Sequence, residues 1–144
     1  MNDETRTTCR PEETFLAGEE LAARLFPGDL VILSGPLGAG KTVFVKGLAQ
    51  GLGLDSTAVH SPSYTMVSEY GPSVTGRRLV HVDLYRVDET AEIEELGLAD
   101  YLTRDHIVAV EWGERLPEAL KRGAVLVSFE DAGEDRRRIS IQSR

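Results

Sequence analysis

Residues 35–42 read Gly-Pro-Leu-Gly-Ala-Gly-Lys-Thr and match the pattern G-x-x-x-x-G-K-[ST] without a gap. The glycines of this pattern allow backbone N–H groups to point at phosphate oxygens. The lysine ammonium supplies a cation for the β- and γ-phosphates, and the hydroxyl of the last residue is a hard oxygen ligand suited to Mg²⁺. These residue types therefore predict the binding of a nucleoside triphosphate with magnesium.

The segments on either side of this loop have the composition that the chemistry requires. Residues 29–34 are apolar and β-branched, which is typical of a buried strand, and residues 43–50 predict a helix that ends at Gly51 or Gly53. The N-terminus of that helix, at Lys41, adds the positive end of a dipole to the site. Strand, glycine-rich loop and helix in this order favour a phosphate-binding loop over a chance glycine-rich turn.

Two acidic residues are candidates for the rest of a hydrolytic site, because each follows an apolar predicted strand. They are Asp83 and Glu111. Ligands of open α/β sheets bind at the carboxyl ends of the strands, so both carboxylates are expected near the loop. We assign Glu111, with Thr42, to magnesium, and Asp83 to orienting the attacking water or to the outer shell of the metal. These two roles could be exchanged.

Other polar and aromatic residues near these motifs allow more than one interpretation. Residues 61–65 read Ser-Pro-Ser-Tyr-Thr, and a hydroxyl there could contact magnesium or a phosphate oxygen, unless the segment is a plain Ser-Pro turn. Trp112 either packs in the core or faces a partner. His60 and His81 do not predict a metal site, because no second nitrogen or sulfur ligand lies at zinc spacing.

Length and composition predict one domain over residues 1–144, with a loosely ordered lead-in over residues 1–11. The net charge of −8 argues against a direct grip on a nucleic-acid backbone. Cys9 is the single cysteine, which excludes an intrachain disulfide and favours a reducing cytosol. The sequence has neither a long apolar run nor a signal-peptide layout, so the expectation is a cytoplasmic protein without membrane attachment.

Periodicity and turn residues predict several further elements. Glu13 or Thr14 is expected to cap a first helix. The other predicted elements are a helix over residues 15–26, a hairpin of strands 64–70 and 78–84, an acidic helix over 91–96, a strand over 107–110, a short helix or turn over 116–120, and an antiparallel pair of strands 124–129 and 138–141.

Six short motifs in a fixed order resemble one known family, the bacterial TsaE (YjeE) family. They are Gly-x-Leu-Gly-Ala-Gly-Lys-Thr at 35–42, Ser-Pro-Ser-Tyr-Thr at 61–65, His-Val-Asp-Leu-Tyr-Arg at 81–86, Glu-Glu-Leu-Gly-Leu at 94–98, Asp-Tyr-Leu at 100–102 and Glu-Trp at 111–112. The resemblance covers about residues 12–120. It implies an α/β, three-layer P-loop NTPase-like fold with a partly mixed sheet and a β-hairpin.

The resemblance also implies a function. Members of this family are small ATPases that bind ATP or ADP with Mg²⁺, hydrolyse ATP slowly when alone, and work with the TsaB–TsaD pair. In that pair TsaD transfers the threonylcarbamoyl group to tRNA adenosine, and the ATPase resets the machinery between turnovers. The ATPase meets tRNA only through the complex, and we expect a monomer when no partner is present.

The resemblance implies roles for individual residues as well. It places Lys41 on the phosphates, Thr42 and Glu111 on magnesium, and Asp83 at the hydrolytic centre; residues 61–65 correspond to a switch-like loop. The resemblance also implies that Pro11, Thr14 and the C-terminal Arg138 border the adenine. The other predicted nucleotide-binding residues are Gly38, Ala39, Gly40, Lys41, Thr42, Val43 and Thr65.

Three other functions are compatible with a phosphate-binding loop. A GTPase is disfavoured, because the guanine-reading Asn-Lys-x-Asp motif is absent. A small-molecule kinase needs a lid and an acceptor pocket, for which the segment between the loop's helix and the hairpin leaves little room. A nucleotide-dependent binding module without significant hydrolysis remains possible, and only partner-dependent stimulation of turnover separates it from the ATPase.

Overall fold

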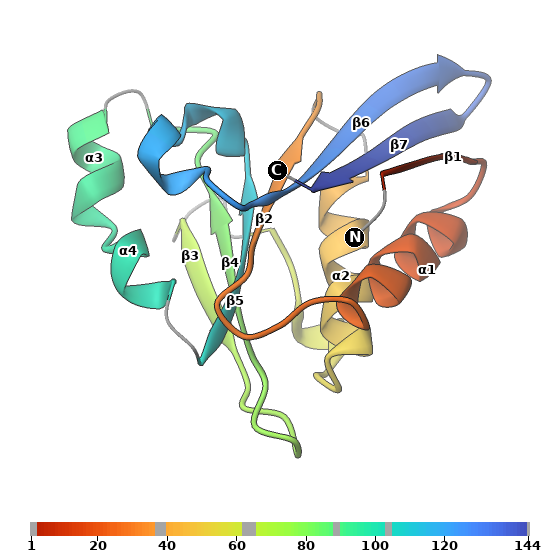
Figure 1. Cartoon of the computed structure of the whole chain (residues 1–144). Helices are drawn as coiled ribbons and strands as arrows, with labels where there is room; N and C mark the ends of the chain where they lie inside the picture. The colour runs from red at the N-terminus through yellow and green to blue at the C-terminus, as the bar shows by residue number, and fades with distance from the viewer. Residues whose placement is uncertain (1–2, 37–39, 62–65, 88–89, 103–104, 144) are drawn as a thin grey trace.

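The structure is a computed structural model that describes residues 3–36, 40–61, 66–87, 90–102 and 105–143 (Figure 1). Within these ranges the strands form one seven-stranded sheet in the order β1-β7-β6-β2-β5-β4-β3. Strands β6, β2, β5 and β4 run parallel, whereas β1, β7 and β3 pair antiparallel. The strands are β1 (Glu4–Thr8), β2 (Leu30–Ser34), β3 (Val67–Tyr70), β4 (Arg78–Asp83), β5 (His106–Glu111), β6 (Val125–Gly133) and β7 (Arg136–Ser143).

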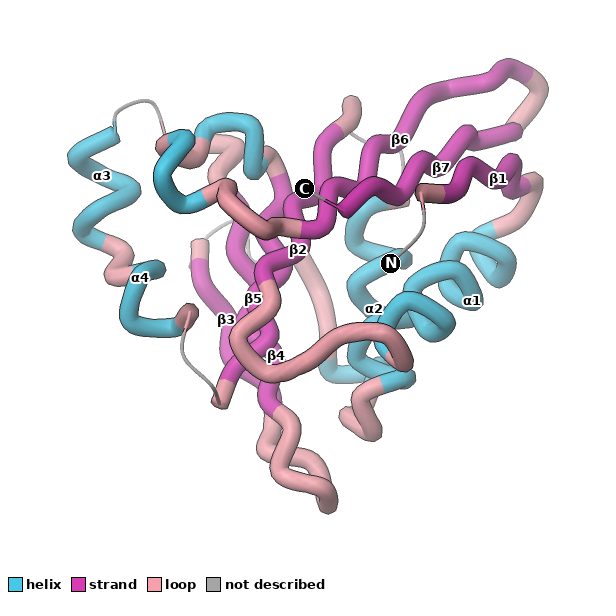
Figure 2. The backbone as a smooth tube through the Cα atoms, viewed as in Figure 1, coloured by secondary structure: helices cyan, strands magenta, loops and turns pink. Residues whose placement is uncertain are grey.

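Helices cover both faces of this sheet, as Figures 1 and 2 show. One face packs on α1 (Pro11–Ala22) and α2 (Lys41–Gly51), and the other on α3 (Thr90–Glu95) and α4 (Leu98–Tyr101). Short 3₁₀ helices lie at Ser56–Ala58, Gly113–Arg115 and Glu118–Leu120. A separate apolar cluster lies on each face. The prediction of a layered α/β fold with a partly mixed sheet is therefore confirmed.

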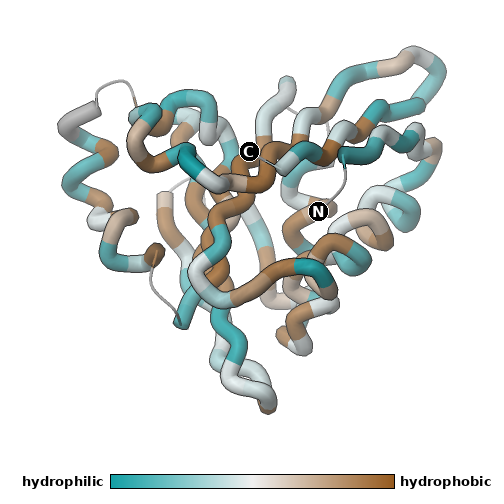
Figure 3. Tube along the Cα trace, in the orientation of Figure 1, coloured by the Kyte–Doolittle hydropathy of each residue, from teal (hydrophilic) through white to brown (hydrophobic). Residues whose placement is uncertain are grey.

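The central strands β2 and β5 are buried on both sides, which explains why their sequences are almost continuously apolar (Figure 3). In β2, Val31 and Leu33 belong to the cluster beneath α1 and α2, while Leu30 and Ile32 belong to the opposite cluster. The strands predicted over residues 29–34 and 107–110 are both confirmed.

Strand β4 differs, because one of its faces changes from apolar to polar toward its carboxyl end. Val80 and Val82 pack in the cluster beneath α3 and α4. Leu79 faces α1 and α2, and side-chain alternation puts His81 and Asp83 on that same face. In the parallel register Asp83 lies opposite Glu111 of β5. The sheet thereby brings three ionisable side chains to the edge beside the N-terminus of α2.

The position of α2 depends on close contact with α1. A Cβ placed on Gly47 of α2 would overlap the carbonyl oxygen of Phe15, and one placed on Gly18 of α1 would overlap the carbonyl oxygen of Phe44. The backbones of the two helices therefore touch where they cross, which fixes the helix whose first turn carries Lys41 and Thr42.

Replacing Gly47 by alanine should consequently lower the free energy of unfolding by about 2 kcal/mol, because overpacking outweighs the better helix propensity of alanine. Urea unfolding measures this change. Gln50→Ala is a matched control, since Gln50 is exposed on the same helix. We expect that change to alter stability by no more than about 0.5 kcal/mol. Equal stabilities of the two variants would contradict the contact.

The start of the chain differs from the prediction. Helix α1 begins at Pro11, preceded by Arg10, and ends at Ala22, so it starts and stops earlier than expected. Proline suits the first helical position because its missing N–H has no intrahelical partner there. Neither Glu13 nor Thr14 is the cap; both lie within the helix.

The lead-in is not loosely ordered, so that prediction was wrong for residues 4–8. They form β1, which pairs antiparallel with β7, with Thr8 opposite Arg137. Thr8 is buried, and its Oγ1 lies 3.0 Å from the Oγ1 of Thr14. The pairing joins opposite ends of the chain, which local sequence patterns do not reveal.

The remaining elements agree with the prediction within a few residues. The β3–β4 and β6–β7 antiparallel pairs are confirmed, and α3 corresponds to the predicted acidic helix. Residues 64 and 65, the start of the first predicted hairpin strand, lie outside the described residues. Among the helices described, none has the length and apolar character needed to cross a bilayer.

Candidate functional site

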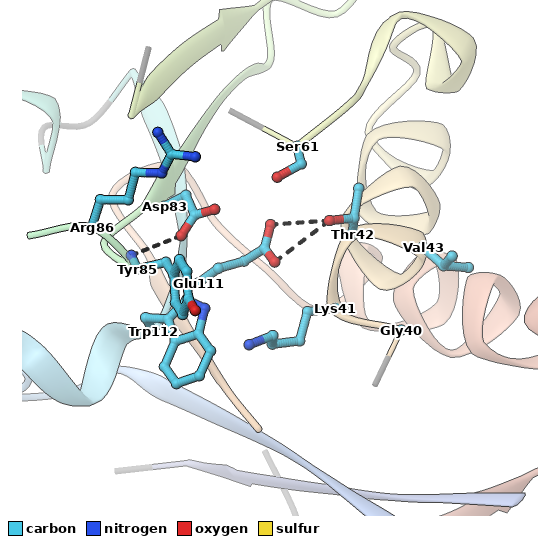
Figure 4. Close-up of a pocket in the computed structure, with 10 residues that line it drawn as sticks. All are labelled: Gly40, Lys41, Thr42, Val43, Ser61, Asp83, Tyr85, Arg86, Glu111 and Trp112. Carbon is cyan, nitrogen blue, oxygen red and sulfur yellow. Dashed lines mark hydrogen bonds between the residues drawn. The ribbon is translucent and has the colours of Figure 1, made fainter. Parts of the chain in front are cut away.

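A cavity of about 400 Å³ lies between the N-terminus of α2 and the carboxyl ends of β4 and β5 (Figure 4). Figure 4 shows the side chains of the first turn of α2 on one side and those of the two strands on the other. The lining residues are Gly40, Lys41, Thr42, Val43, Ser61, Asp83, Tyr85, Arg86, Glu111 and Trp112. The structure therefore brings Lys41, Thr42, Asp83 and Glu111 together, as the sequence predicted.

Lys41 is the buried cation of this cavity, which Arg86 also lines. Its side chain is buried, its Nζ donates to the carbonyl oxygen of Gly35 at 2.6 Å, and it lies 3.9 Å from the centroid of the Trp112 ring. Burial lowers the pKa of Lys41, and the nearby carboxylates, foremost that of Glu111, oppose this shift. The ammonium is thus held by a carbonyl and a ring face, which phosphate oxygens can replace.

Glu111 lies between a hydroxyl and an imidazole. Thr42 Oγ1 donates to the carboxylate, with distances of 3.3 and 3.5 Å to its two oxygens. His81 Nε2 lies 2.5 Å from Glu111 Oε2, which is also the carboxylate oxygen nearer to Thr42. Both Glu111 and His81 are buried. The carboxylate is therefore held in a defined position at the edge of the cavity.

Thr42 and Glu111 fit the requirements of a magnesium ion. Two oxygens that bind one Mg²⁺ lie at most about 4.2 Å apart, twice the usual metal–oxygen distance, and these two side chains satisfy that limit. The part of the chain that the structure describes has no cluster of three or more His, Cys, Asp or Glu side chains able to hold a metal. Mg²⁺ commonly takes one or two protein ligands together with nucleotide phosphates, so this small donor set suits it.

Asp83 lies beside this pair but makes a different contact. Its Oδ1 accepts a hydrogen bond from the backbone N–H of Tyr85 at 2.9 Å, and it is buried. The hydroxyl of Thr42 donates to Glu111. Ser61, from the segment after α2, also points into the cavity (Figure 4). Asp83 thus lies in the cavity beside Glu111, and the hydrogen bond that it accepts among the described residues comes from the backbone of Tyr85 and not from Thr42.

Two residues that support the site, Arg115 and His81, were not among the site residues predicted from the sequence. Arg115 Nη1 donates to the carbonyl oxygens of Leu84, Tyr85 and Val87, at 2.8, 2.5 and 2.9 Å. Its guanidinium also lies 5.6 Å from the Trp112 ring centroid. No local pattern identifies such a contact. The second residue, His81, could have been found, because strand alternation puts it on the same face as Asp83.

Trp112 lines the cavity, so it does more than fill the core. Its backbone adopts the left-handed region, with φ of 60°, and its ring packs on Tyr85 with centroids 5.1 Å apart. The ammonium of Lys41 also lies over the Trp112 ring. Tyr85 is 43% exposed, so this aromatic pair extends from the lysine to the surface.

A second cavity of about 440 Å³ lies on the other side of the loop's helix, and Gly40 and Val43 line both cavities. It contains Pro11 and Thr14, the residues expected beside the base. Its lining residues are Thr8, Cys9, Arg10, Pro11, Thr14, Gly40, Val43, Asp135 and Arg137.

Arg10 and Arg137 line this cavity, whereas Arg138, the arginine predicted beside the adenine, does not. Arg137 lies on the face of β7 that also carries the buried Ile139 and Ile141. Arg138 is on the opposite face, exposed and 3.5 Å from Glu130. Adjacent strand residues point to opposite faces, so an error of one position moves a side chain out of the site. Gly38, Ala39 and Thr65, also predicted to contact the nucleotide, lie outside the described residues.

Comparison with known proteins decides the family. A sequence model described as "Threonylcarbamoyl adenosine biosynthesis protein TsaE" matches residues 8–139. The chain belongs to the TsaE family. The match confirms the resemblance found in the sequence and extends it into β7, beyond the last motif.

Individual TsaE proteins resemble the chain over most of its length. The tRNA threonylcarbamoyladenosine biosynthesis protein TsaE of Bacillus subtilis (strain 168) is 40% identical over 134 residues, which are 93% of this chain and 82% of the relative. The protein of the same name from Mycobacterium tuberculosis (strain ATCC 25618 / H37Rv) is 38% identical, over 96% of this chain and 86% of the relative. The crystal structure of Bacillus subtilis YdiB matches with a TM-score of 0.75 and 32% identity, covering 99% of this chain and 86% of that one.

Proposed function

We propose that this TsaE-family protein is a magnesium-dependent ATPase that supports threonylcarbamoyl transfer to tRNA adenosine by a TsaB–TsaD complex. The observation that carries the proposal is the arrangement of Lys41 and Thr42 at the N-terminus of α2 with Glu111 facing Thr42. A helix N-terminus, a buried cation and a paired hydroxyl and carboxylate are the groups that a triphosphate with magnesium needs.

Each side chain has a proposed role. The ammonium of Lys41 leaves the carbonyl of Gly35 for the β- and γ-phosphates. Thr42 and Glu111 would hold Mg²⁺, which would supply positive charge beside the phosphate oxygens. Asp83 orients the attacking water from its position beside Glu111, since its Oδ1 is already fixed by the Tyr85 N–H. Trp112 and Tyr85 cover the cavity from the side opposite the helix.

The second cavity is proposed to hold the base, because it adjoins the phosphate side at Gly40 and Val43. Arg137→Gln should weaken ATP binding about tenfold, since a guanidinium against an aromatic base contributes about 1–2 kcal/mol. Titration calorimetry with ATP measures this affinity. Arg138→Gln is the matched control, since Arg138 lies on the opposite face, and it should leave the affinity unchanged. Equal effects of the two changes would exclude the cavity as the base site.

The partner part of the proposal is supported by the names of the relatives and by charge. The similar proteins are named for tRNA threonylcarbamoyladenosine biosynthesis. With a net charge of −8 this chain is poorly suited to bind tRNA directly, so it is proposed to act through a protein complex in the cytoplasm. Alone, the chain is proposed to be monomeric.

The deciding experiment measures ATP hydrolysis by the purified chain, alone and with TsaB–TsaD from the same organism, with GTP as the control nucleotide. We expect slow turnover of ATP that rises with the pair, and no turnover of GTP. ATP binding without hydrolysis under either condition would instead favour the nucleotide-dependent binding module. An absence of complex formation and of stimulation would contradict the role with these partners.

A further inference from the structure

His81 is the one fully buried ionisable side chain in the described part of the chain, with 0% exposure. Its Nε2 lies 2.5 Å from Glu111 Oε2. An ionised carboxylate only accepts hydrogen bonds, so the imidazole nitrogen donates. The other nitrogen, Nδ1, has no hydrogen-bond partner within the described residues. Among the described residues, the imidazole therefore forms its hydrogen bond with Glu111.

His81 lines neither cavity, and its burial keeps it from touching a nucleotide. It contacts the site only through the carboxylate that faces Thr42. We propose that His81 is a positioning residue, which fixes the carboxylate of Glu111 toward Thr42 and thereby sets the magnesium affinity of the nucleotide site. This inference rests on the proposed function and goes beyond it by naming what controls metal affinity.

The sheet register explains how the contact forms. His81 of β4 lies opposite Ala109 of β5, and Glu111 is the next residue of β5 on the same face. Because the side chain of Ala109 is small, the imidazole can lean along the strand toward Glu111. A glutamate side chain has several rotatable bonds, so a fixed donor removes freedom that a metal would otherwise have to restrict.

The chemical nature of the donor also matters. Nε2 of His81 donates to the carboxylate, and Nδ1 has no hydrogen-bond partner among the described residues. A hydrogen-bond donor in this place orients the carboxylate toward Thr42. The ammonium of Lys41 cannot orient the carboxylate of Glu111 while it contacts the phosphates.

The test uses two amide variants that differ by one methylene. His81→Gln can present a donor at nearly the position of Nε2, whereas His81→Asn is too short to reach Glu111. A third variant, His81→Met, fills the buried space without a donor. Calorimetry with a non-hydrolysable ATP analogue, in EDTA and over a series of Mg²⁺ concentrations, separates the metal-dependent from the metal-free affinity. Thermal unfolding of each variant accompanies the titrations.

We expect His81→Asn and His81→Met to raise the half-saturating Mg²⁺ concentration about 10–100-fold, the usual effect of removing a group that holds a metal ligand. The affinity in EDTA should stay near that of the wild type, and His81→Gln should recover most of the magnesium response. A weaker magnesium response in either His81→Asn or His81→Met is enough to support the inference. The test therefore still works if one of these two variants fails to fold.

Two results would overturn the inference: the same magnesium response in all variants, or equal losses with and without the metal, which indicate a purely structural role. If the wild-type protein bound the analogue without any response to Mg²⁺, the magnesium site itself would be refuted, and this inference with it. If the wild type responds and the variants match it, only the role of His81 fails.

Discussion

Replacing Lys41 by alanine should weaken ATP binding at least about 100-fold, because removing one partner of a desolvated charge pair costs about 3 kcal/mol or more. Lys41 is buried at the start of α2 and lines the cavity between α2, β4 and β5. The existing partners of its ammonium are a carbonyl oxygen and a tryptophan ring, neither of which carries a full charge. Calorimetry with ATP and magnesium measures the loss.

Lys46→Ala is the control for this result, since it removes the same charge from the same helix away from both cavities. Its ATP affinity should remain within about threefold of the wild type, because solvent and salt screen a charge that lies away from the site. Circular dichroism establishes that both variants fold. ATP binding by Lys41→Ala at wild-type affinity would refute the phosphate site.

Glu111→Gln should produce a different defect, in which turnover falls about 100-fold or more while much of the nucleotide binding persists. The change keeps the shape of the side chain but removes the negative charge beside Thr42. The carboxylate also opposes the effect of burial on Lys41, so its loss lowers the pKa of Lys41 further. Two measurements separate the loss of charge beside Thr42 from the effect on Lys41. They are steady-state hydrolysis at increasing magnesium concentration and ADP binding in EDTA.

The matched control is Glu114→Gln, which removes a carboxylate that also acts on the charge of Lys41 but does not line the cavity. Its hydrolysis and magnesium response should resemble those of the wild type. Undiminished turnover by Glu111→Gln would show that the metal assignment is wrong. A loss confined to ADP affinity in EDTA would instead indicate that Glu111 acts mainly on Lys41.

The sequence by itself determined the features that depend on neighbouring residues. The glycine-rich loop, its lysine and its hydroxyl lie within one octapeptide, so their chemistry can be read without knowing the fold. Buried strands were predicted for a similar reason, since β2 and β5 are apolar over consecutive residues. The candidate acids Asp83 and Glu111 followed from their positions at the ends of such strands.

Only the tertiary structure decided which side chains meet. The contact of His81 with Glu111 joins residues 30 positions apart, and that of Thr42 with Glu111 joins residues 69 apart. Both contacts depend on β5 lying between β2 and β4, which no local pattern specifies. The strand order β1-β7-β6 likewise turned an expected loose lead-in into an edge strand.

The register of β7 selected Arg137 over Arg138 for the second cavity, because consecutive residues in a strand point to opposite faces. Local composition predicts that a segment is a strand, but its neighbours and its facing residues are set by packing against the rest of the chain. The residue types of the site could therefore be read from the sequence, whereas the pairs that they form were set by the fold.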